Sequence, residues 1–246
     1  MLSLQSSARL AAAVVACGVA ASAYADAPPM TLNVTAGGVG KQVSLNPNFV
    51  SGSGVGFYSG SVTGTASAWQ VDYSFSAASA AQTASQSGSL IVKNLSSSEL
   101  TFGIVLSLPI DSAPQQTGLF NGSLSGSLTT TAQGGYLTSV SSMPIWMATV
   151  EGGSVASLFP APVALSRSTA GSTSFGSQSF GGSQPSLPHA LFGSNMAVVL
   201  NFRLSAGSTA TFSSALGGLG VPVPAPGALA LLAMSGVVGI GRRRRR

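Results

Sequence analysis

The sequence predicts an all-β protein, an antiparallel β-sandwich of the Greek-key or jelly-roll kind. Several segments alternate apolar and polar residues, which is the period of a strand with one buried face. Glycine, serine, asparagine and proline separate these segments, and no amphipathic helix of convincing length lies between them. Short strands joined by turns, without intervening helices, are typical of a sandwich or barrel rather than of an α/β fold.

Three segments show the alternation most clearly. In residues 69–75 the tryptophan, valine, tyrosine and phenylalanine side chains share one face. Residues 100–110 repeat the pattern, and Pro109 lacks the N–H group that a central strand uses, so we expect the strand to end or lie at an edge there. Residues 196–204 form a third such face.

The remaining strand candidates alternate less strictly, and turn residues bound each of them. They are residues 32–35, 56–63, 90–95, 118–130, 145–150 and 208–213. Residues 166–188, rich in serine, glycine and glutamine, are expected to form a long surface loop or two poorly formed strands. The globular domain is therefore predicted to span residues 26–212, a length that suits one all-β domain.

The first 25 residues have the pattern of a secretory signal peptide. Arg9 precedes an apolar run over residues 10–21, and small residues follow it. The pattern Ala23-Tyr24-Ala25 predicts cleavage after Ala25, with an alternative cut after Ala23. We therefore expect an exported protein whose mature chain begins near Asp26.

Cys17, the single cysteine of the chain, leaves a second interpretation of this segment open. Val14-Val15-Ala16-Cys17 loosely resembles a lipoprotein box, in which the cysteine would carry a lipid. If the signal peptide is removed instead, the exported protein contains no cysteine and folds without a disulfide.

The last residues have the pattern of a membrane anchor. Residues 213–226 predict a linker, flexible at Gly217 and Gly218 and stiffened further on by prolines. Residues 227–241 are uncharged and would span about 22 Å as a helix, short against a hydrocarbon core of about 30 Å, so flanking residues must help. The terminal arginines predict a cytoplasmic tail, which places the preceding domain outside. They are Arg242, Arg243, Arg244, Arg245 and Arg246.

This ending resembles the PEP-CTERM sorting signal of exported bacterial proteins. That signal joins a proline-rich motif, one hydrophobic helix and an arginine-rich tail, and all of these parts occur here. The motif is Pro224-Ala225-Pro226, a variant with alanine where the family usually has glutamate. The resemblance implies processing by signal peptidase and an exosortase-type membrane protease. It also implies anchoring in the inner membrane, then a place at the cell surface or outside the cell.

The net charge of +5 does not indicate a nucleic-acid-binding protein. Six of the ten basic residues lie in the signal peptide and the arginine tail. The body keeps four basic against five acidic side chains, so its net charge is about −1. A body without a basic stripe is not expected to bind phosphates.

Catalytic and metal-binding patterns are sparse. His189 is the only histidine, and no serine lies in a G-x-S-x-G elbow, so a Ser-His-Asp triad has no support and His189 is expected at a turn or surface. One histidine and one cysteine are too few for a zinc site. Gly52, Gly54 and Gly56 do not match a dinucleotide fingerprint and indicate a turn. We therefore predict no catalytic residue, no metal site and no cofactor.

Four carboxylates define one alternative, a hydrolase or an oxygen-liganded calcium site: Asp72, Glu99, Asp111 and Glu151. Either would require at least two of these side chains to converge, and their spacing forms no ligand ladder. Asp72 lies on the polar face of its strand, so we expect it to be solvated.

Aromatic side chains define another alternative, because exposed rings on a β-sandwich can stack on sugars. Trp69 and Tyr73 are expected in the core, since they share a strand face with other apolar side chains. The pattern does not place Trp146, Tyr58 or Tyr136, and a flat exposed platform of these rings would favour carbohydrate binding.

The sequence thus predicts an envelope or extracellular-matrix protein with a structural or adhesive role. Carbohydrate binding is the first alternative, with an extracellular polysaccharide as partner, and a carboxylate-based hydrolase is the second.

Overall fold

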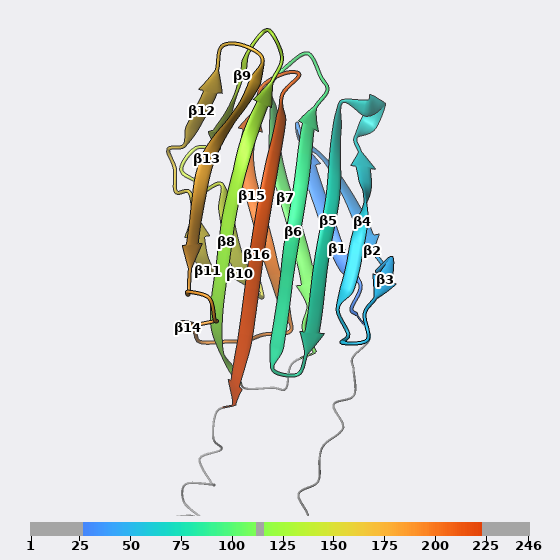
Figure 1. The fold of residues 1–246 in the computed structure, drawn as a ribbon, viewed down its shortest axis with the longest axis vertical. Helices are drawn as coiled ribbons and strands as arrows, with labels where there is room; N and C mark the ends of the chain where they lie inside the picture. Colours follow the sequence, from blue (N-terminus) through green and yellow to red (C-terminus); the bar gives the residue numbers. More distant parts are fainter. Residues whose placement is uncertain (1–26, 112–115, 223–246) are drawn as a thin grey trace, which may run out of the picture.

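The computed structural model describes residues 27–111 and 116–222, which form two antiparallel β-sheets packed face to face (Figure 1). The first sheet runs in order through β11 (Gly153–Leu158), β10 (Trp146–Val150), β15 (Asn195–Leu204), β7 (Leu100–Pro109), β1 (Met30–Ala36) and β2 (Val39–Leu45). Two further strands extend it, β9 (Gly135–Ser139) beside β15 and β12 (Ala164–Arg167) beside β9.

The second sheet runs through β13 (Gly171–Phe180), β8 (Gln116–Thr130), β16 (Thr209–Pro222), β6 (Thr83–Asn94), β5 (Trp69–Ala80), β4 (Gly56–Thr63) and β3 (Phe49–Val50). The short strand β14 (Leu187–His189) pairs with β8. A single 3-10 turn, η1 (Thr65–Ser67), joins β4 to β5. This arrangement confirms the predicted all-β class with two antiparallel sheets.

The three strictly alternating segments all form strands with a buried face, in β5, β7 and β15. β7 ends at Pro109, where the missing N–H group led us to expect an end or an edge. It is also a central strand, paired with β1 on one side and β15 on the other. Strict alternation therefore identified two central strands of the first sheet, β7 and β15, and one strand of the second, β5.

The core lies between the sheets and is rich in aromatic side chains. Phe202 on β15 faces Phe212 on β16, with ring centroids 4.9 Å apart. Trp146 on β10 is fully buried and donates its indole N–H to the Ser214 hydroxyl at 2.8 Å. These contacts connect the sheets, and a buried indole N–H with a partner avoids the cost of an unpaired donor.

Strand β13 corrects the expectation of a loop or poorly formed strands over residues 166–188. It is a regular ten-residue strand paired with β8. Phe175 and Phe180 are an odd number of residues apart, yet both contact the core, because the register shifts by one residue between Ser174 and Gly176. This bulge hides the alternation from the sequence pattern.

Strand β16 corrects the predicted end of the domain at residue 212. The strand continues to Pro222 in the middle of the second sheet, so residues 213–222 are not a linker. Gly217 and Gly218, expected to make the chain flexible, pair with β6 on one side and β8 on the other. Gly218 faces Phe120 and Phe192, which occupy the space a larger residue would need.

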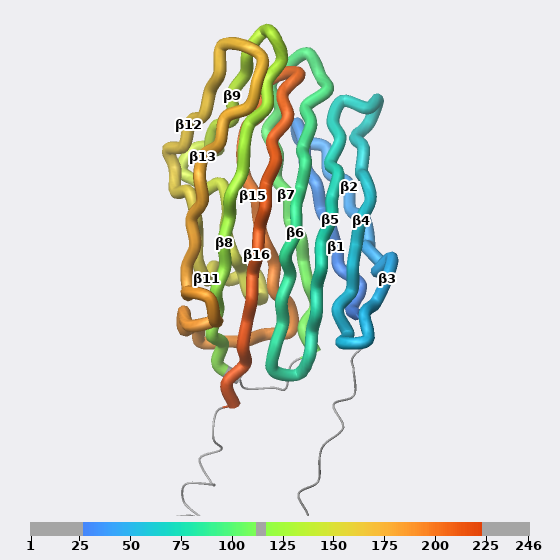
Figure 2. The backbone as a smooth tube through the Cα atoms, in the orientation of Figure 1, coloured from blue at the N-terminus to red at the C-terminus, as the bar shows by residue number. Residues whose placement is uncertain are grey.

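The described chain begins and ends at the same end of the sandwich, which we call the proximal end (Figure 2). The opposite, distal end carries the loops of residues 95–99, 131–134 and 205–208 (Figure 1). The predicted signal peptide, the sorting motif Pro224-Ala225-Pro226, the apolar segment 227–241 and the arginine tail lie outside the described residues. Within residues 27–111 and 116–222, no helix combines the length and the hydropathy of a membrane span.

Candidate functional site

The outward side of the second sheet carries small hydroxyl side chains in aligned rows. Antiparallel pairing places partner residues side by side on one face, so the register decides which side chains are neighbours. One row consists of a serine on each of six successive strands, from β4 through β5, β6, β16 and β8 to β13. These residues, the serine row, are Ser59, Ser74, Ser89, Ser213, Ser125 and Ser177.

The two neighbouring rows extend this surface, which we call the hydroxyl face. Towards the distal end the row is Ser61, Asp72, Ile91, Thr211, Ser127 and Ser174. Towards the proximal end the row is Phe57, Ser76, Ser87, Ala215, Ser123 and Ser179. Adjacent strands lie about 4.8 Å apart, so the hydroxyl groups repeat at nearly constant spacing across the sheet.

The same two-residue period that builds the core also builds this face. In residues 122–127 of β8, glycine and leucine point inward while Ser123, Ser125 and Ser127 point outward. The inward glycines Gly122 and Gly126 leave room for the rings of Phe180 and Phe175. The serines therefore face outward because the aromatic rings of β13 occupy the inner side.

The hydroxyl face is almost uncharged. Among the outward side chains described on these strands, the charged ones are Asp72 and Lys93, and they form an ion pair at 2.9 Å. The Lys93 ammonium, and then the Gln70 amide, hold the pKa of Asp72 below its usual value by hydrogen bonding. Asp72 is thus half-exposed and paired rather than simply solvated as expected, and the pair cancels its own charge.

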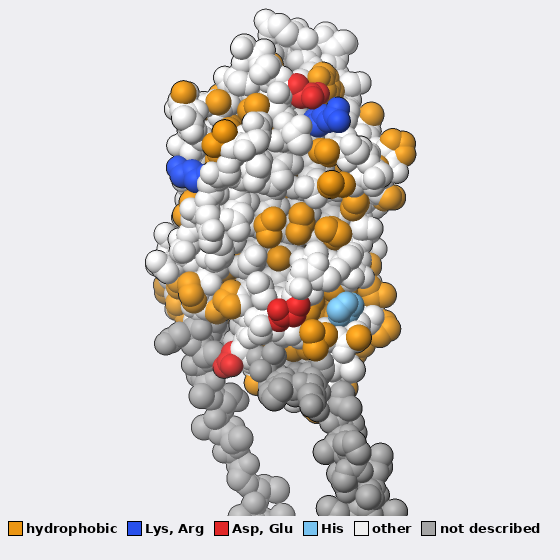
Figure 3. Space-filling model, turned by 180° about the vertical axis from the view of Figure 1, so that it is seen from behind, with side chains coloured by type: hydrophobic (Ala, Val, Ile, Leu, Met, Phe, Trp, Pro, Cys, Tyr) orange, Lys and Arg blue, Asp and Glu red, His pale blue; other side chains and the backbone are white. Residues whose placement is uncertain are grey.

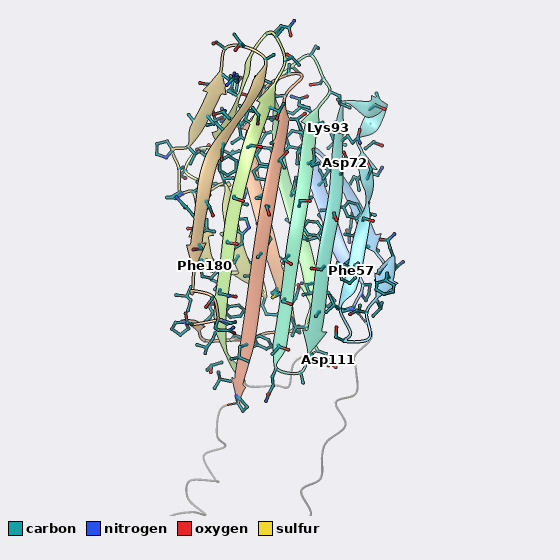
Figure 4. All side chains as sticks on the ribbon, in the orientation of Figure 1. Phe57, Asp72, Lys93, Asp111 and Phe180 are labelled. Carbon is teal, nitrogen blue, oxygen red and sulfur yellow. The ribbon has the colours of Figure 1, made fainter. Side chains whose placement is uncertain are left out.

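An exposed aromatic pair lies at the edge of the hydroxyl face. Phe49 on β3 and Phe57 on β4 are paired across the strands, with ring centroids 5.9 Å apart. Phe49 is 63% exposed and Phe57 is 44% exposed. Tyr58 points into the core, so Phe57 points to the outside, beside Ser76 (Figure 4). We call Phe49 and Phe57 the edge pair.

A shallow groove of about 290 Å³ lies on the second sheet near the proximal end. Gly217 and Gly218 contribute to its floor, while Asn121, Gln184 and Pro185 line one side. The Asn121 side chain occupies the space above Gly217, where a β-carbon would clash with its amide oxygen. The groove adds amide donors and acceptors to the neighbouring hydroxyls.

The outward side of the first sheet differs from the hydroxyl face. Its central row places Val105, Val199 and Met147 side by side on β7, β15 and β10, and all three are half-buried. Figure 3 shows hydrophobic side chains in the middle of this side, with charged groups scattered towards the ends. The regular hydroxyl pattern therefore belongs to the second sheet.

Three of the four candidate carboxylates, Asp72, Glu99 and Glu151, have separate hydrogen-bond partners. Glu99 accepts a hydrogen bond from the Tyr136 hydroxyl at 2.8 Å, which raises the pKa of Tyr136. Glu151 accepts bonds from the hydroxyl and backbone N–H of Ser194, which lower its pKa. Asp111 follows β7 at the proximal end, while Asp72 lies towards the distal end on the other sheet (Figure 4). No group of three or more acidic, histidine or cysteine side chains that could hold a metal occurs within the described residues.

His189 is the last residue of strand β14, so it is not at the expected turn, but its partly exposed side chain agrees with the expected surface position. Its Nδ1 is 2.9 Å from the Leu191 carbonyl oxygen, and its ring meets Phe120 edge-on at 6.0 Å. The imidazole is half-buried and contacts no carboxylate among the hydrogen bonds of the described residues. Its contacts are those of a packed strand residue.

The aromatic platform considered from the sequence does not form. Trp146 and Tyr58 are buried, and the Tyr58 hydroxyl donates to the Pro28 carbonyl at 2.7 Å, with burial raising its pKa. Tyr136 alone is exposed, at 38%. Trp69 is buried as expected, and Tyr73 is partly buried against the core. One signal for the edge pair is present in the sequence: Phe57 and Tyr58 are consecutive, so on a strand they must face opposite sides.

A scan against models of known protein families found no match, and a search of curated proteins found no significant match either.

Proposed function

We propose that this protein is an exported component of the bacterial cell envelope or extracellular matrix, with a structural or adhesive role, and that the hydroxyl face is its contact surface. The observation that carries this proposal is the serine row, which crosses six adjoining strands without interruption. A sheet face that covers no other layer and repeats one small polar group suits contact with an extended, repetitive material.

The positions of the described ends support this role. Both lie at the proximal end, so a membrane anchor following residue 222 would direct the distal end away from the membrane, with the hydroxyl face running along the side of the domain (Figure 1). We retain as parts of the proposal a signal peptide over residues 1–25 and an apolar helix over 227–241. Exosortase-type processing near Pro226 is the third part.

We propose a non-catalytic role because three of the four carboxylates considered for catalysis are engaged by separate partners. Asp72 pairs with Lys93, Glu99 with Tyr136 and Glu151 with Ser194. A general acid and base would have to share one cleft.

Two measurements on cells that produce the full chain test this function. Fractionation locates the protein, and the intact mass of the recovered protein shows where its chain begins and ends. We expect the protein in the envelope or extracellular fraction, without residues 1–25 and with the chain ending near Pro226. An anchored protein that keeps Arg246 would remove exosortase processing from the proposal and leave the rest. A soluble cytosolic protein with both termini intact would contradict it.

A further inference from the structure

We propose that the hydroxyl face and the edge pair together bind an extended, uncharged polysaccharide, with Phe49 and Phe57 stacking on the sugar rings. This inference rests on the proposed function, since it names the partner of the same surface. It differs from the platform considered from the sequence, because none of Trp146, Tyr58 and Tyr136 takes part.

The edge pair provides the apolar part of the site. Two phenylalanine rings at 63% and 44% exposure form an apolar cluster on an otherwise hydroxyl-rich surface. Exposed clusters rimmed by polar groups mark binding surfaces more often than chance. Sugar rings offer C–H faces for such contacts, while their edges carry hydroxyl groups.

The register aligns the edge pair with a row of hydroxyls. Phe57 is followed across the sheet by Ser76 and Ser87, then by Ala215, Ser123 and Ser179. A polymer lying across the strands from Phe57 would meet a new small side chain about every 4.8 Å. That spacing is close to the length of one sugar unit in an extended glycan, so successive units would have equivalent neighbours.

The charge of the surface favours an uncharged polymer over the other partners. The described outward charges, Asp72 and Lys93, neutralise each other, so neither a polyanion nor a polycation finds a complementary field. A protein partner would be expected to meet a central apolar patch with a polar rim. Here the centre consists of serines, and the apolar side chains lie at the edge.

Affinity electrophoresis of the full chain tests the proposal directly. The protein, in a non-ionic detergent without sugar headgroups, is run through gels containing hydroxyethylcellulose, glucomannan, xylan or dextran, with alginate as the charged comparison. We expect at least one uncharged polysaccharide to retard the wild type more than alginate does. Replacing the ring in Phe57→Ala should weaken that association about tenfold.

Two matched variants control for general effects. Leu95→Ala removes an apolar side chain from the distal end that is 52% exposed, more than Phe57, and this variant should bind as the wild type does. Ser213→Arg places a long side chain in the middle of the serine row and should abolish retardation. Thr35→Arg places the same side chain on the outward side of β1 in the first sheet, and this variant should be retarded like the wild type. Unchanged circular dichroism would verify that each variant is folded.

The outcomes separate this inference from the proposed function. Migration unaffected by every uncharged polysaccharide, or equal weakening by Phe57→Ala and Leu95→Ala, overturns glycan binding while export and envelope location still stand. A third outcome is that no polysaccharide retards the wild type, but the wild type associates with itself as its concentration rises and Ser213→Arg abolishes this association. That result would show that the hydroxyl face joins copies of the chain instead. A cytosolic full chain would defeat the proposed function whatever the gels show.

Discussion

At the scale of single residues, the inward glycines decide how closely the strands and aromatic rings pack. Gly88 on β6 lies against Ser74 and Phe75 of β5, and a β-carbon there would clash with the Ser74 carbonyl oxygen. That oxygen belongs to the backbone and cannot rotate away. The alternation of glycine and serine is therefore a packing requirement on the inner side as well as a source of hydroxyls on the outer one.

We predict that Gly88→Ala lowers the free energy of unfolding by about 1–3 kcal/mol, the usual cost of overpacking. Gly52→Ala is the matched control, because a β-carbon at Gly52 meets no atom within 4 Å. Urea unfolding of the two variants measures the difference. Equal midpoints would contradict this explanation of the glycines.

Asn94 is a second residue whose side chain holds several segments together. It is fully buried, and its amide donates to the carbonyls of Ser98 at 2.8 Å and Leu204 at 2.9 Å. Its side-chain oxygen accepts from the N–H and hydroxyl of Ser96. The residue thus fixes the loop between β6 and β7 against the end of β15.

We predict that Asn94→Ala destabilises the fold by about 1–3 kcal/mol, because the buried Leu204 carbonyl would lose its donor. Asn33→Ala, on the outward side of β1, serves as the control and should change stability little. Thermal unfolding compares them. A larger loss from Asn33→Ala would be inconsistent with the role assigned to Asn94.

Glu151 makes the free energy of unfolding depend on pH. Its hydrogen bonds from Ser194 lower its pKa from the ordinary 4.5, so the folded state binds this proton less readily than the unfolded state. The contribution is fully present above that ordinary value and is lost as the pH falls through the lower, folded pKa. We predict that Glu151→Gln narrows the difference in unfolding midpoint between pH 6 and pH 3. Identical pH profiles of variant and wild type would refute this.

At the scale of whole elements, the apolar alternation decided which strands could be predicted. β5, β7 and β15 alternate large apolar side chains with polar ones, so one buried face could be identified from the sequence. The second half of β16 places Gly218 and Gly220 inward, where those strands have a large side chain, and in β13 a bulge interrupts the spacing of the inward Phe175 and Phe180. Their inner contacts come from rings on other strands or lie across a bulge, and such contacts leave no periodic signal.

The corrected end of the domain gives an element-scale prediction. β16 pairs with β6 and β8 along its length, so ending the chain after Phe212 would remove ten residues from the middle of the second sheet. We predict that residues 26–222 show a cooperative unfolding transition and that residues 26–212 do not. Circular dichroism during heating distinguishes the two, and cooperative unfolding of the shorter chain would contradict the assignment.

The sequence predicts which residue types the candidate site contains, but not how those residues are arranged. The abundance of serine and threonine is visible in the sequence, and the two-residue period places them on an outer face. The serine row needs the register of five strand pairs, which no local pattern specifies. The edge pair was hidden for the same reason, since Phe49 and Phe57 become neighbours only through the pairing of β3 with β4.

At the scale of the whole molecule, an aromatic core and a nearly uncharged outer face are two sides of the same sheet. The buried rings pack against the inner side of that sheet, and the paired serines give its outer side a repetitive, neutral surface. Both described ends lie at the proximal end, so neither residue 27 nor residue 222 lies over the middle of this surface. The central claim is that the hydroxyl face binds the protein to the envelope or extracellular material around it.

Retention of the full chain in washed extracellular material, compared between Ser213→Arg and Thr35→Arg, tests that claim most directly. Both variants add the same side chain to an exposed position on an outward strand face, one in the serine row and the other on the first sheet. We predict that Ser213→Arg is washed out while Thr35→Arg is retained like the wild type. Equal retention of the two variants would contradict a contact role for the hydroxyl face.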